Sequence, residues 1–298
     1  MSKLAILSRH AARLTLVLGL LAAPNTARGQ TAPAIDILVL YTGTAADEFA
    51  KRKRSIEKEI AFVSHMQNRI FEASGVNARV NIVAKLWAEF DEAKHTPANL
   101  VCDPSTLDCA NFNFQIGLIS HIATETKNSD AYAVNKHRKQ AGADLVSLWM
   151  WRAGWDTRGS AAAGLRKDDY NLGNGVPFSA QNRFLSLIVA EKAWLWWHFA
   201  HEIGHSLGLG DTGDSPSDLI HDDAFGYVDT QFPFRTIMAD DDECNKAGFA
   251  ACMRIPLYSN ADPAFRYLGH PIGKKGFNAA RTLNETAPFV AGYSDVLP

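Results

Sequence analysis

The sequence predicts an α/β fold with a smaller, irregular C-terminal part. Short apolar runs that are rich in branched residues alternate with longer amphipathic stretches, which is typical of buried strands separated by helices. After Gly208 the chain is mostly rich in Asp, Gly and Pro, which favours loops. Strands that alternate with helices, followed by an irregular tail, indicate an α/β sandwich with a smaller C-terminal subdomain.

The elements can be assigned in order from their hydrophobic patterns. Strands are expected at 35–41, 78–87, 143–151 and 184–189, with an edge strand near 161–165. Helices are expected at 44–73, 114–126, 131–140, 190–207 and 278–284.

Composition and charge exclude several classes of protein. The chain has 298 residues, of which 47% are apolar and 21% are charged, so it can build a core and is not a disordered tail. Residues 1–29 hold four of the 30 basic side chains and no acidic one, which leaves 26 basic against 32 acidic, or −6, over residues 30–298. This acidic balance argues against binding to nucleic acid or to anionic membranes.

The first 29 residues resemble a secretory signal peptide. Three basic residues precede ten apolar or small residues at 14–23, and Ala27-Arg28-Gly29 follows as a small-x-small cleavage site. The alternative is a membrane anchor, but ten residues are too few to cross about 30 Å of hydrocarbon. We therefore expect a signal peptide at 1–29 and a secreted or periplasmic protein that leaves the membrane after cleavage.

Four cysteines in an exported chain indicate two disulfides. Three pairings are open, and the short spacings favour Cys102–Cys109 and Cys244–Cys252. The alternative is a structural zinc site made of all four cysteines, which the absence of a CxxC pair disfavours.

The segment 201–211 carries the chemistry of the chain. On a helix, His201 and His205 lie one turn apart, so both imidazoles can bind one metal ion. Glu202 lies beside them and can hold a water molecule as general base. Gly208 ends the helix, and Asp211 can then supply a third ligand. Two histidines and one carboxylate leave a fourth position open, which predicts a catalytic Zn²⁺ centre.

Other acidic residues of the same region suggest a second, weaker hypothesis. Five aspartates lie between 211 and 223 and could bind Ca²⁺, but they lack the EF-hand spacing, so a solvated loop is the alternative.

These residues resemble the metzincin clan of zinc endopeptidases, whose motif is HExxHxxGxx(H/D). The sequence TIMA at 236–239 is similar to the Met-turn of that clan. Four segments resemble bacterial reprolysin-like enzymes of the peptidyl-Asp metalloendopeptidase kind: IDILVLYTGTAADE, GADLVSL, FGYVDTQFPFRTIMA and CMRIPLYSNADP.

The resemblance implies a five-stranded, twisted, mostly parallel sheet with long helices and a site helix on the floor of a cleft. It implies one catalytic domain over 30–298, with an upper subdomain at about 30–208 and a lower one at about 209–298. His201, His205 and Asp211 are the implied zinc ligands, with Glu202 as general base.

Two departures from the family pattern stand out. The usual third ligand is His, whereas this chain has Asp211, as in snapalysin-like relatives; Asp214 and His221 are the alternatives. Some relatives also place a Tyr two residues after the Met-turn Met, where this chain has Asp240.

The expected function is that of a secreted zinc metalloendopeptidase that hydrolyses protein or peptide substrates. The alternatives are a catalytically inactive binding or adhesion module, a protein that uses zinc only for stability, and a zinc amidase of small substrates. Residues 30–34 contain no cysteine, so we expect no cysteine switch and no long inhibitory pro-domain. The enzyme is then expected to become active once it is exported, folded and loaded with zinc, or to be restrained by a separate protein inhibitor.

Overall fold

The computed structural model describes residues 31–88, 130–151, 159–161, 165, 167, 185–189, 195–211 and 214–296. The chain divides into two compact units, Met1–Thr31 and Ala32–Pro298, and the second unit holds every element discussed below. The predicted signal peptide, the 114–126 helix and the Cys102–Cys109 pair lie outside the described residues.

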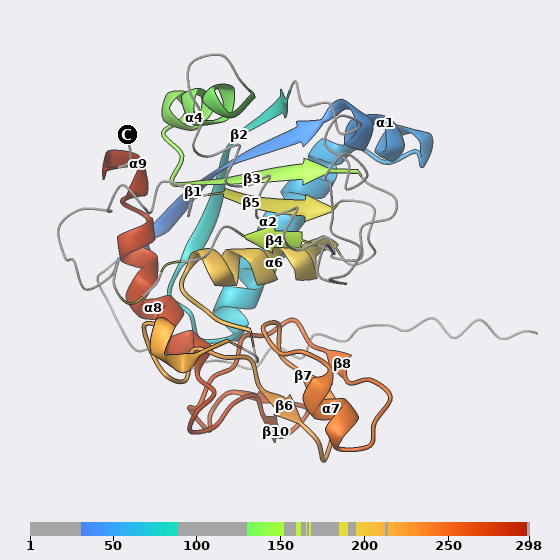
Figure 1. The fold of residues 1–298 in the computed structure, drawn as a ribbon, viewed down its shortest axis with the longest axis vertical. Helices are drawn as coiled ribbons and strands as arrows, with labels where there is room; N and C mark the ends of the chain where they lie inside the picture. The colour runs from blue at the N-terminus through green and yellow to red at the C-terminus, as the bar shows by residue number, and fades with distance from the viewer. Residues whose placement is uncertain are drawn as a thin grey trace, which may run out of the picture. The chain divides into compact units, whose positions relative to one another are not determined.

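A mixed sheet of five strands forms the centre of the second unit and confirms the predicted α/β fold (Figure 1). The strand order is β2-β1-β3-β5-β4. Four strands run parallel, and β4 pairs with β5 in the antiparallel direction. The strands are β1 (Ala34–Thr42), β2 (Arg79–Ala88), β3 (Leu145–Met150), β4 (Gly159–Ala161) and β5 (Leu185–Val189). The edge strand β4 therefore starts before the predicted 161–165.

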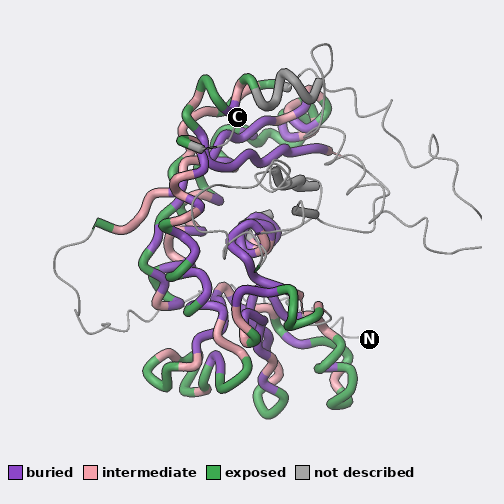
Figure 2. The backbone as a smooth tube through the Cα atoms, turned by 60° about the vertical axis from the view of Figure 1, so that its left-hand side comes forward, coloured by how far each residue is buried: buried purple, intermediate pink, exposed green. Residues whose placement is uncertain are grey.

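The strand β1 lies inside this sheet and is buried because it has neighbours on both sides. It pairs with β2 and with β3, both parallel. Parallel strands that are covered on both faces read as continuous apolar runs, and Ile37, Leu38, Val39 and Leu40 are all buried. Figure 2 shows that buried residues concentrate in the central strands, whereas the outer loops carry the exposed ones.

The prediction of one helix over 44–73 is wrong, because the structure has two helices here. They are α1 (Gly43–Lys51) and α2 (Ile56–Ala73). Lys53 adopts a φ of 56°, in the left-handed region that breaks a helix. Ser55 then caps the new helix by accepting a hydrogen bond from Lys58 N. The amphipathic pattern runs across this break, which is why it did not reveal the turn.

Two further helices agree with the predicted positions where the structure describes them. They are α4 (Asp130–Ala141) and α6 (Leu195–Ser206). The helix α6 contacts α2, β4 and β5, and Figure 1 shows α2 crossing behind the sheet. Within the described ranges, no helix is both long and apolar enough to span a membrane.

The segment after α6 contains short elements rather than loop alone. Its strands form a β6-β7-β8 sheet and a β9-β10 pair. A separate apolar cluster that includes Tyr227, Phe234 and Ile255 supports them. The elements are the 3-10 helix η4 (Pro216–Asp218), β6 (Val228–Asp229), β7 (Phe234–Arg235), α7 (Asp242–Lys246), β8 (Met253–Arg254), β9 (Arg266–Tyr267) and β10 (His270–Pro271).

The last helices return to the main sheet. The helix α8 (Ala279–Val290) contacts β1, and α9 (Tyr293–Val296) follows it. The helix α8 extends six residues beyond the predicted end at Asn284, because a stripe of residues that includes Thr286, Ala287 and Val290 continues to be buried.

Candidate metal centre

The helix α6 places two imidazoles side by side. His201 and His205 are one helical turn apart, and their ring centroids are 4.6 Å apart at an interplanar angle of 87°. Tyr258 anchors this helix, because its buried hydroxyl donates a 2.6 Å hydrogen bond to the carbonyl of Ala200. Gln67 of α2 donates to the same hydroxyl oxygen at 3.3 Å. The orientation of the histidine-bearing face is therefore fixed against α2.

Backbone carbonyls determine which nitrogen of each imidazole is available. His201 Nδ1 lies 3.3 Å from the carbonyl oxygen of Ile237, and His205 Nδ1 lies 3.0 Å from that of Leu209. A carbonyl can only accept a hydrogen bond, so both Nδ1 atoms donate. In the neutral imidazoles both Nε2 atoms then carry free lone pairs, which is the state that a metal ligand requires.

The end of α6 follows from Gly208. This glycine has a φ of +93°, and two hydrogen bonds, Gly208 N to the His205 carbonyl and Leu209 N to the Gly204 carbonyl, complete a Schellman motif. The left-handed turn reverses the chain immediately after the second histidine. Asp211 is thereby brought back to the histidine face.

The three donor groups form a compact triangle. The two Nε2 atoms are 3.0 Å apart, and the Asp211 carboxylate oxygens lie 3.3 Å from His201 Nε2 and 3.5 Å from His205 Nε2. Each of the three residues offers one ligand atom, and these atoms all lie within 4.8 Å of one another. Among the described residues, this is the group of His, Cys, Asp or Glu side chains that could hold a metal ion.

The triangle has the dimensions of a zinc site. Tetrahedral Zn²⁺ binds imidazole nitrogen and carboxylate oxygen at about 2.0–2.2 Å, which places two donors about 3.3 Å apart. Three electron-rich atoms at this separation repel one another unless a proton or a cation lies among them. The residues therefore fit a zinc ion with three protein ligands.

Glu202 lies next to His201 on the same helix and is almost completely buried, with 4% of the residue exposed. Its Oε2 atom is buried and has no hydrogen-bond partner among the described residues. Burial raises the pKa of Glu202 to about 8. A buried, charged oxygen without a hydrogen-bond partner is costly, so Oε2 is suited to holding a proton or a water molecule.

The charges of the triangle are coupled. Burial opposes the charged form of His205, but the hydrogen bond and the negative charge of Asp211 outweigh it and raise the pKa of His205 to about 9. Burial and the neighbouring His205 lower the pKa of His201. The histidines similarly lower the pKa of Asp211 against the effect of burial. In the metal-free protein, protonated His205 therefore supplies the positive charge beside Asp211 that a bound metal ion would otherwise supply.

The segment that resembles a Met-turn lies directly beneath the histidines. An alanine Cβ at position 204 would lie 2.6 Å from Met238 Sδ, so Met238 fills the space that Gly204 leaves between the two histidines. Met238 is fully buried. The preceding residue, Ile237, supplies the carbonyl that orients His201. This segment thus supports the site through both packing and hydrogen bonding.

The alternative third ligands lie elsewhere. Asp214 accepts a 3.1 Å hydrogen bond from the backbone N–H of Asp211 through Oδ2 and so stabilises the turn. His221 pairs with Glu285 of α8 at 2.7 Å. Among the proposed calcium-binding aspartates, Asp223 pairs with Arg281 at 2.6 Å. Calcium binding stays a prediction.

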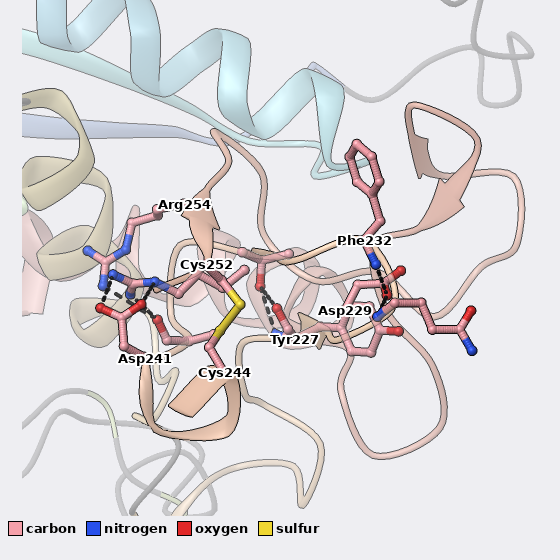
Figure 3. The surroundings of a disulfide bond; sticks show 11 residues. Tyr227, Asp229, Phe232, Asp241, Cys244, Cys252 and Arg254 are labelled. Atoms are coloured by element: carbon pink, nitrogen blue, oxygen red, sulfur yellow. Dashed lines mark hydrogen bonds and ion pairs between the residues drawn. A yellow bond between two sulfur atoms is a disulfide. The ribbon is translucent and has the colours of Figure 1, made fainter. Parts of the chain in front are cut away.

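A pair of arginines near the site was not predicted from the sequence. Arg235 Nη1 donates to the carbonyl of Ala239 at 2.6 Å, and Arg254 Nη2 lies 3.4 Å from the same oxygen. Arg235 also forms an ion pair with Asp241 at 2.8 Å. The disulfide Cys244–Cys252 joins α7 to the residue before β8, which confirms one of the two predicted bonds. Figure 3 shows Arg254 and Asp241 close together on one side of this disulfide.

An α/β sheet with a glutamate and two histidines on one helix, and a carboxylate returned by a glycine turn, is typical of metallopeptidases. Residues 31–250 match the family model described as Metallo-peptidase family M12, and the chain belongs to this family. It is 26% identical over 297 residues to the Peptidyl-Asp metalloendopeptidase of Pseudomonas aeruginosa. The match covers 94% of this chain and 43% of the relative, so the chain spans less than half of that protein.

A solved structure supports the fold alone. It is described as the structure of a chaperone-substrate complex, and it matches with a TM-score of 0.56 at 16% identity. The match covers 88% of this chain and 35% of the solved one.

Proposed function

We propose that the protein is an exported, zinc-dependent endopeptidase that hydrolyses peptide bonds in protein or peptide substrates. The observation that carries this proposal is the triangle of His201, His205 and Asp211 donors beside the buried carboxylate of Glu202, whose Oε2 has no hydrogen-bond partner among the described residues. Membership of family M12 supports the same reaction class.

His201 and His205 would hold the ion through Nε2, and Asp211 through its carboxylate. When bound, zinc supplies Lewis acidity, which makes water more acidic and polarises a peptide carbonyl. The carbonyls of Ile237 and Leu209 keep both imidazoles in the ligating tautomer. Three protein ligands leave room for a water molecule or substrate, which distinguishes a catalytic site from a closed structural one.

Glu202 would act as the general base and then as the general acid. Its carboxylate takes a proton from the attacking water and delivers it to the nitrogen of the leaving amine. Because the pKa of Glu202 is about 8 in the metal-free site, its carboxyl group is protonated at neutral pH. A bound cation would favour the carboxylate form again.

Further parts of the proposal concern location, substrate and organisation. A disulfide between Cys244 and Cys252 is typical of an exported protein, and we infer cleavage of the signal peptide after Gly29. We also infer upper and lower subdomains that meet near Gly208, and restraint by a separate inhibitor. The name of the relative in Pseudomonas aeruginosa supports a preference for an acidic residue in the substrate.

The test is digestion of casein by Glu202→Gln and wild-type protein after loading with zinc. The amide cannot accept the proton, so we expect a loss of about 10²–10⁴ in rate while zinc per protein stays unchanged. The wild type should lose activity on chelation and regain it with zinc. Hydrolysis by the variant at the wild-type rate would contradict the assigned base. Zinc binding without hydrolysis in the wild type would favour a binding module.

A further inference from the structure

The turn at 236–239 is held by the side chain of the residue that precedes it, Arg235. Only 7% of Arg235 is exposed. Its strand β7 pairs with β6 on one side and with β8 on the other, so two neighbouring strands fix the backbone from which this side chain starts. The guanidinium group then contacts the chain again beyond the turn.

Arg235 makes these contacts at two points. Its Nη1 donates a 2.6 Å hydrogen bond to the carbonyl of Ala239. Its Nη2 donates a 2.9 Å hydrogen bond to Asp241 Oδ2, and its Nε lies 2.8 Å from Asp241 Oδ1. The rigid guanidinium can face a carboxylate with two nitrogens and a carbonyl with the third. One side chain thus joins the start of the turn to its end.

The opposite side of the turn is closely packed. A Cβ at position 226 would overlap the backbone N of Ala239, so the backbone of Gly226 packs directly against the peptide between Met238 and Ala239. Ala239 is fully buried, so its carbonyl oxygen needs a donor from within the protein. The turn is therefore held by packing against Gly226 and by hydrogen bonds to Arg235.

This turn carries two groups that contact the site helix. The carbonyl oxygen of Ile237 lies 3.3 Å from His201 Nδ1, and Met238 fills the space beside Gly204. Both residues lie between the two points that Arg235 joins. A hydrogen bond of 3.3 Å is already at the long end of the usual range, so a small shift of the turn would break it.

We propose that Arg235 is a positioning residue of the metal centre, which holds the turn at 236–239 in the place where the carbonyl of Ile237 orients His201 for metal binding. This inference rests on the proposed zinc site and deepens it. Arg235 acts through the turn and through the shape of its guanidinium group. A lysine that keeps the charge but lacks the fork should not replace it.

The test compares Arg235→Lys with Arg138→Lys. Arg138 is a matched control, because 1% of it is exposed and it also donates to a backbone carbonyl, that of Ala143, at 3.1 Å. It belongs to α4, which contacts β1 and β2. Both variants are expected to be less stable than the wild type, and thermal unfolding shows whether each of them is folded.

The decisive measurements are zinc affinity, by competition with a chelator, and the visible absorption of the cobalt-substituted protein, which reports the geometry of the ligands. Loss of a group that orients a ligating histidine weakens metal binding by about tenfold to a hundredfold. We expect this loss and shifted cobalt bands in Arg235→Lys, whereas Arg138→Lys should match the wild type in both. Wild-type affinity and spectrum in folded Arg235→Lys, or an equal loss in Arg138→Lys, would overturn the proposal.

If Arg235→Lys does not fold, Asp241→Asn decides. The Asp241 side chain is 41% exposed, so this substitution weakens one of the two contact points without opening the core. We expect several-fold weaker zinc binding, and an unchanged affinity would overturn the proposal. Zinc binding without hydrolysis in the wild type would overturn the endopeptidase function alone. A wild type that binds no zinc would overturn the proposed function and this inference with it.

Discussion

Two carbonyl groups, those of Ile237 and Leu209, determine the chemistry of the histidines at the level of single atoms. They come from different parts of the chain, one from the Met238 turn and one from the turn after α6. Each holds the Nδ1 proton of one imidazole and so directs the Nε2 lone pair toward the centre. The two proposed histidine ligands are therefore oriented before any ion binds, which would reduce the entropy cost of metal binding.

At the same scale, the three candidates for the third ligand can be ranked. We expect Asp211→Ala to lose most of its zinc on dialysis, because only Asp211 approaches both Nε2 atoms within 3.5 Å. His221→Ala should keep its zinc, since His221 pairs with Glu285. Asp211→His should also keep zinc. The zinc content per protein after dialysis measures this ranking. Loss of metal from His221→Ala, and not from Asp211→Ala, would assign the third ligand to His221.

The raised pKa of His205 has a consequence for pH dependence. The pKa is about 9 in the folded, metal-free protein against 6.5 for the ordinary group, so the charged imidazole stabilises that protein below about pH 6.5. This contribution is lost as the pH rises through about 9. Zinc requires neutral His205, so near pH 7.5 we expect binding to release about one proton or more and to tighten up to about pH 9.

Calorimetry in buffers with different ionisation enthalpies measures this proton release. His221→Ala is the control and should release the same number of protons as the wild type. Zinc binding that releases no proton at pH 7.5 would show that His205 is already neutral.

The sequence predicted the residues whose spacing is local. His201, Glu202 and His205 lie on one helix, and Gly208 fixes where that helix ends, so their arrangement follows from helical geometry. Arg254 could not be found in this way. It lies 43 residues after Asp211, and the tertiary fold rather than local spacing brings its Nη2 within 3.4 Å of the carbonyl oxygen of Ala239. The hydrogen-bond partners of the histidines are backbone carbonyls, so no residue type in the sequence could identify them.

At the scale of elements, the end of α6 is the critical junction. The carbonyl of Leu207 accepts a 2.7 Å hydrogen bond from Thr286 of α8, and Gly208 turns the chain. An alanine at 208 would place its Cβ 3.0 Å from Ile220 and 3.2 Å from the Leu165 carbonyl oxygen. Both the positive φ and these contacts oppose any larger residue.

We therefore expect Gly208→Ala to lower the free energy of unfolding by about 1–3 kcal/mol and to weaken zinc binding. Gly248→Ala is a matched control, because Gly248 has a φ of +85° but no atom within 4 Å of the added Cβ. It should be destabilised less and should bind zinc as the wild type does. Chemical denaturation and zinc titration measure both effects, and equal zinc affinities in the two variants would contradict the argument.

The existence of the main elements could be predicted better than their limits. Continuous apolar runs identified β1 and β3 because buried parallel strands need no polar face. The break between α1 and α2 was missed, since Lys53 enters the left-handed region without a glycine. The extent of α8 depends on what covers it, and that information lies in β1 and in Leu207, which follows α6, rather than in the helix itself.

For the molecule as a whole, one buried carboxylate connects distant parts of the chain. Asp144 accepts hydrogen bonds from the backbone N–H of Asp36 at 2.8 Å and from that of Ser294 at 2.9 Å. These residues belong to the first strand and the last helix, and Asp144 precedes β3. Burial raises the pKa of Asp144 against these hydrogen bonds.

We expect Asp144→Asn to lower the free energy of unfolding by about 1–3 kcal/mol, because the amide nitrogen cannot accept and leaves one N–H unsatisfied. Asp295→Asn, on the exposed side of α9, is the control and should change little. Denaturant unfolding measures both. Equal stability of the two variants would mean that the buried carboxylate does not link the first strand to the last helix.

The return of α8 to the residue that follows α6 makes part of the fold depend on residues that are synthesised late. The hydroxyl of Thr286 donates to the carbonyl of Leu207, and the backbone N–H of Ser294 donates to Asp144. Thr286 and Ser294 are synthesised 75 and 83 positions after Asp211. A chain still leaving the ribosome or the translocation channel lacks these contacts. The segment after α6 that leads into the Gly208 turn therefore gains the support of Thr286 only once the C-terminal helices have been synthesised.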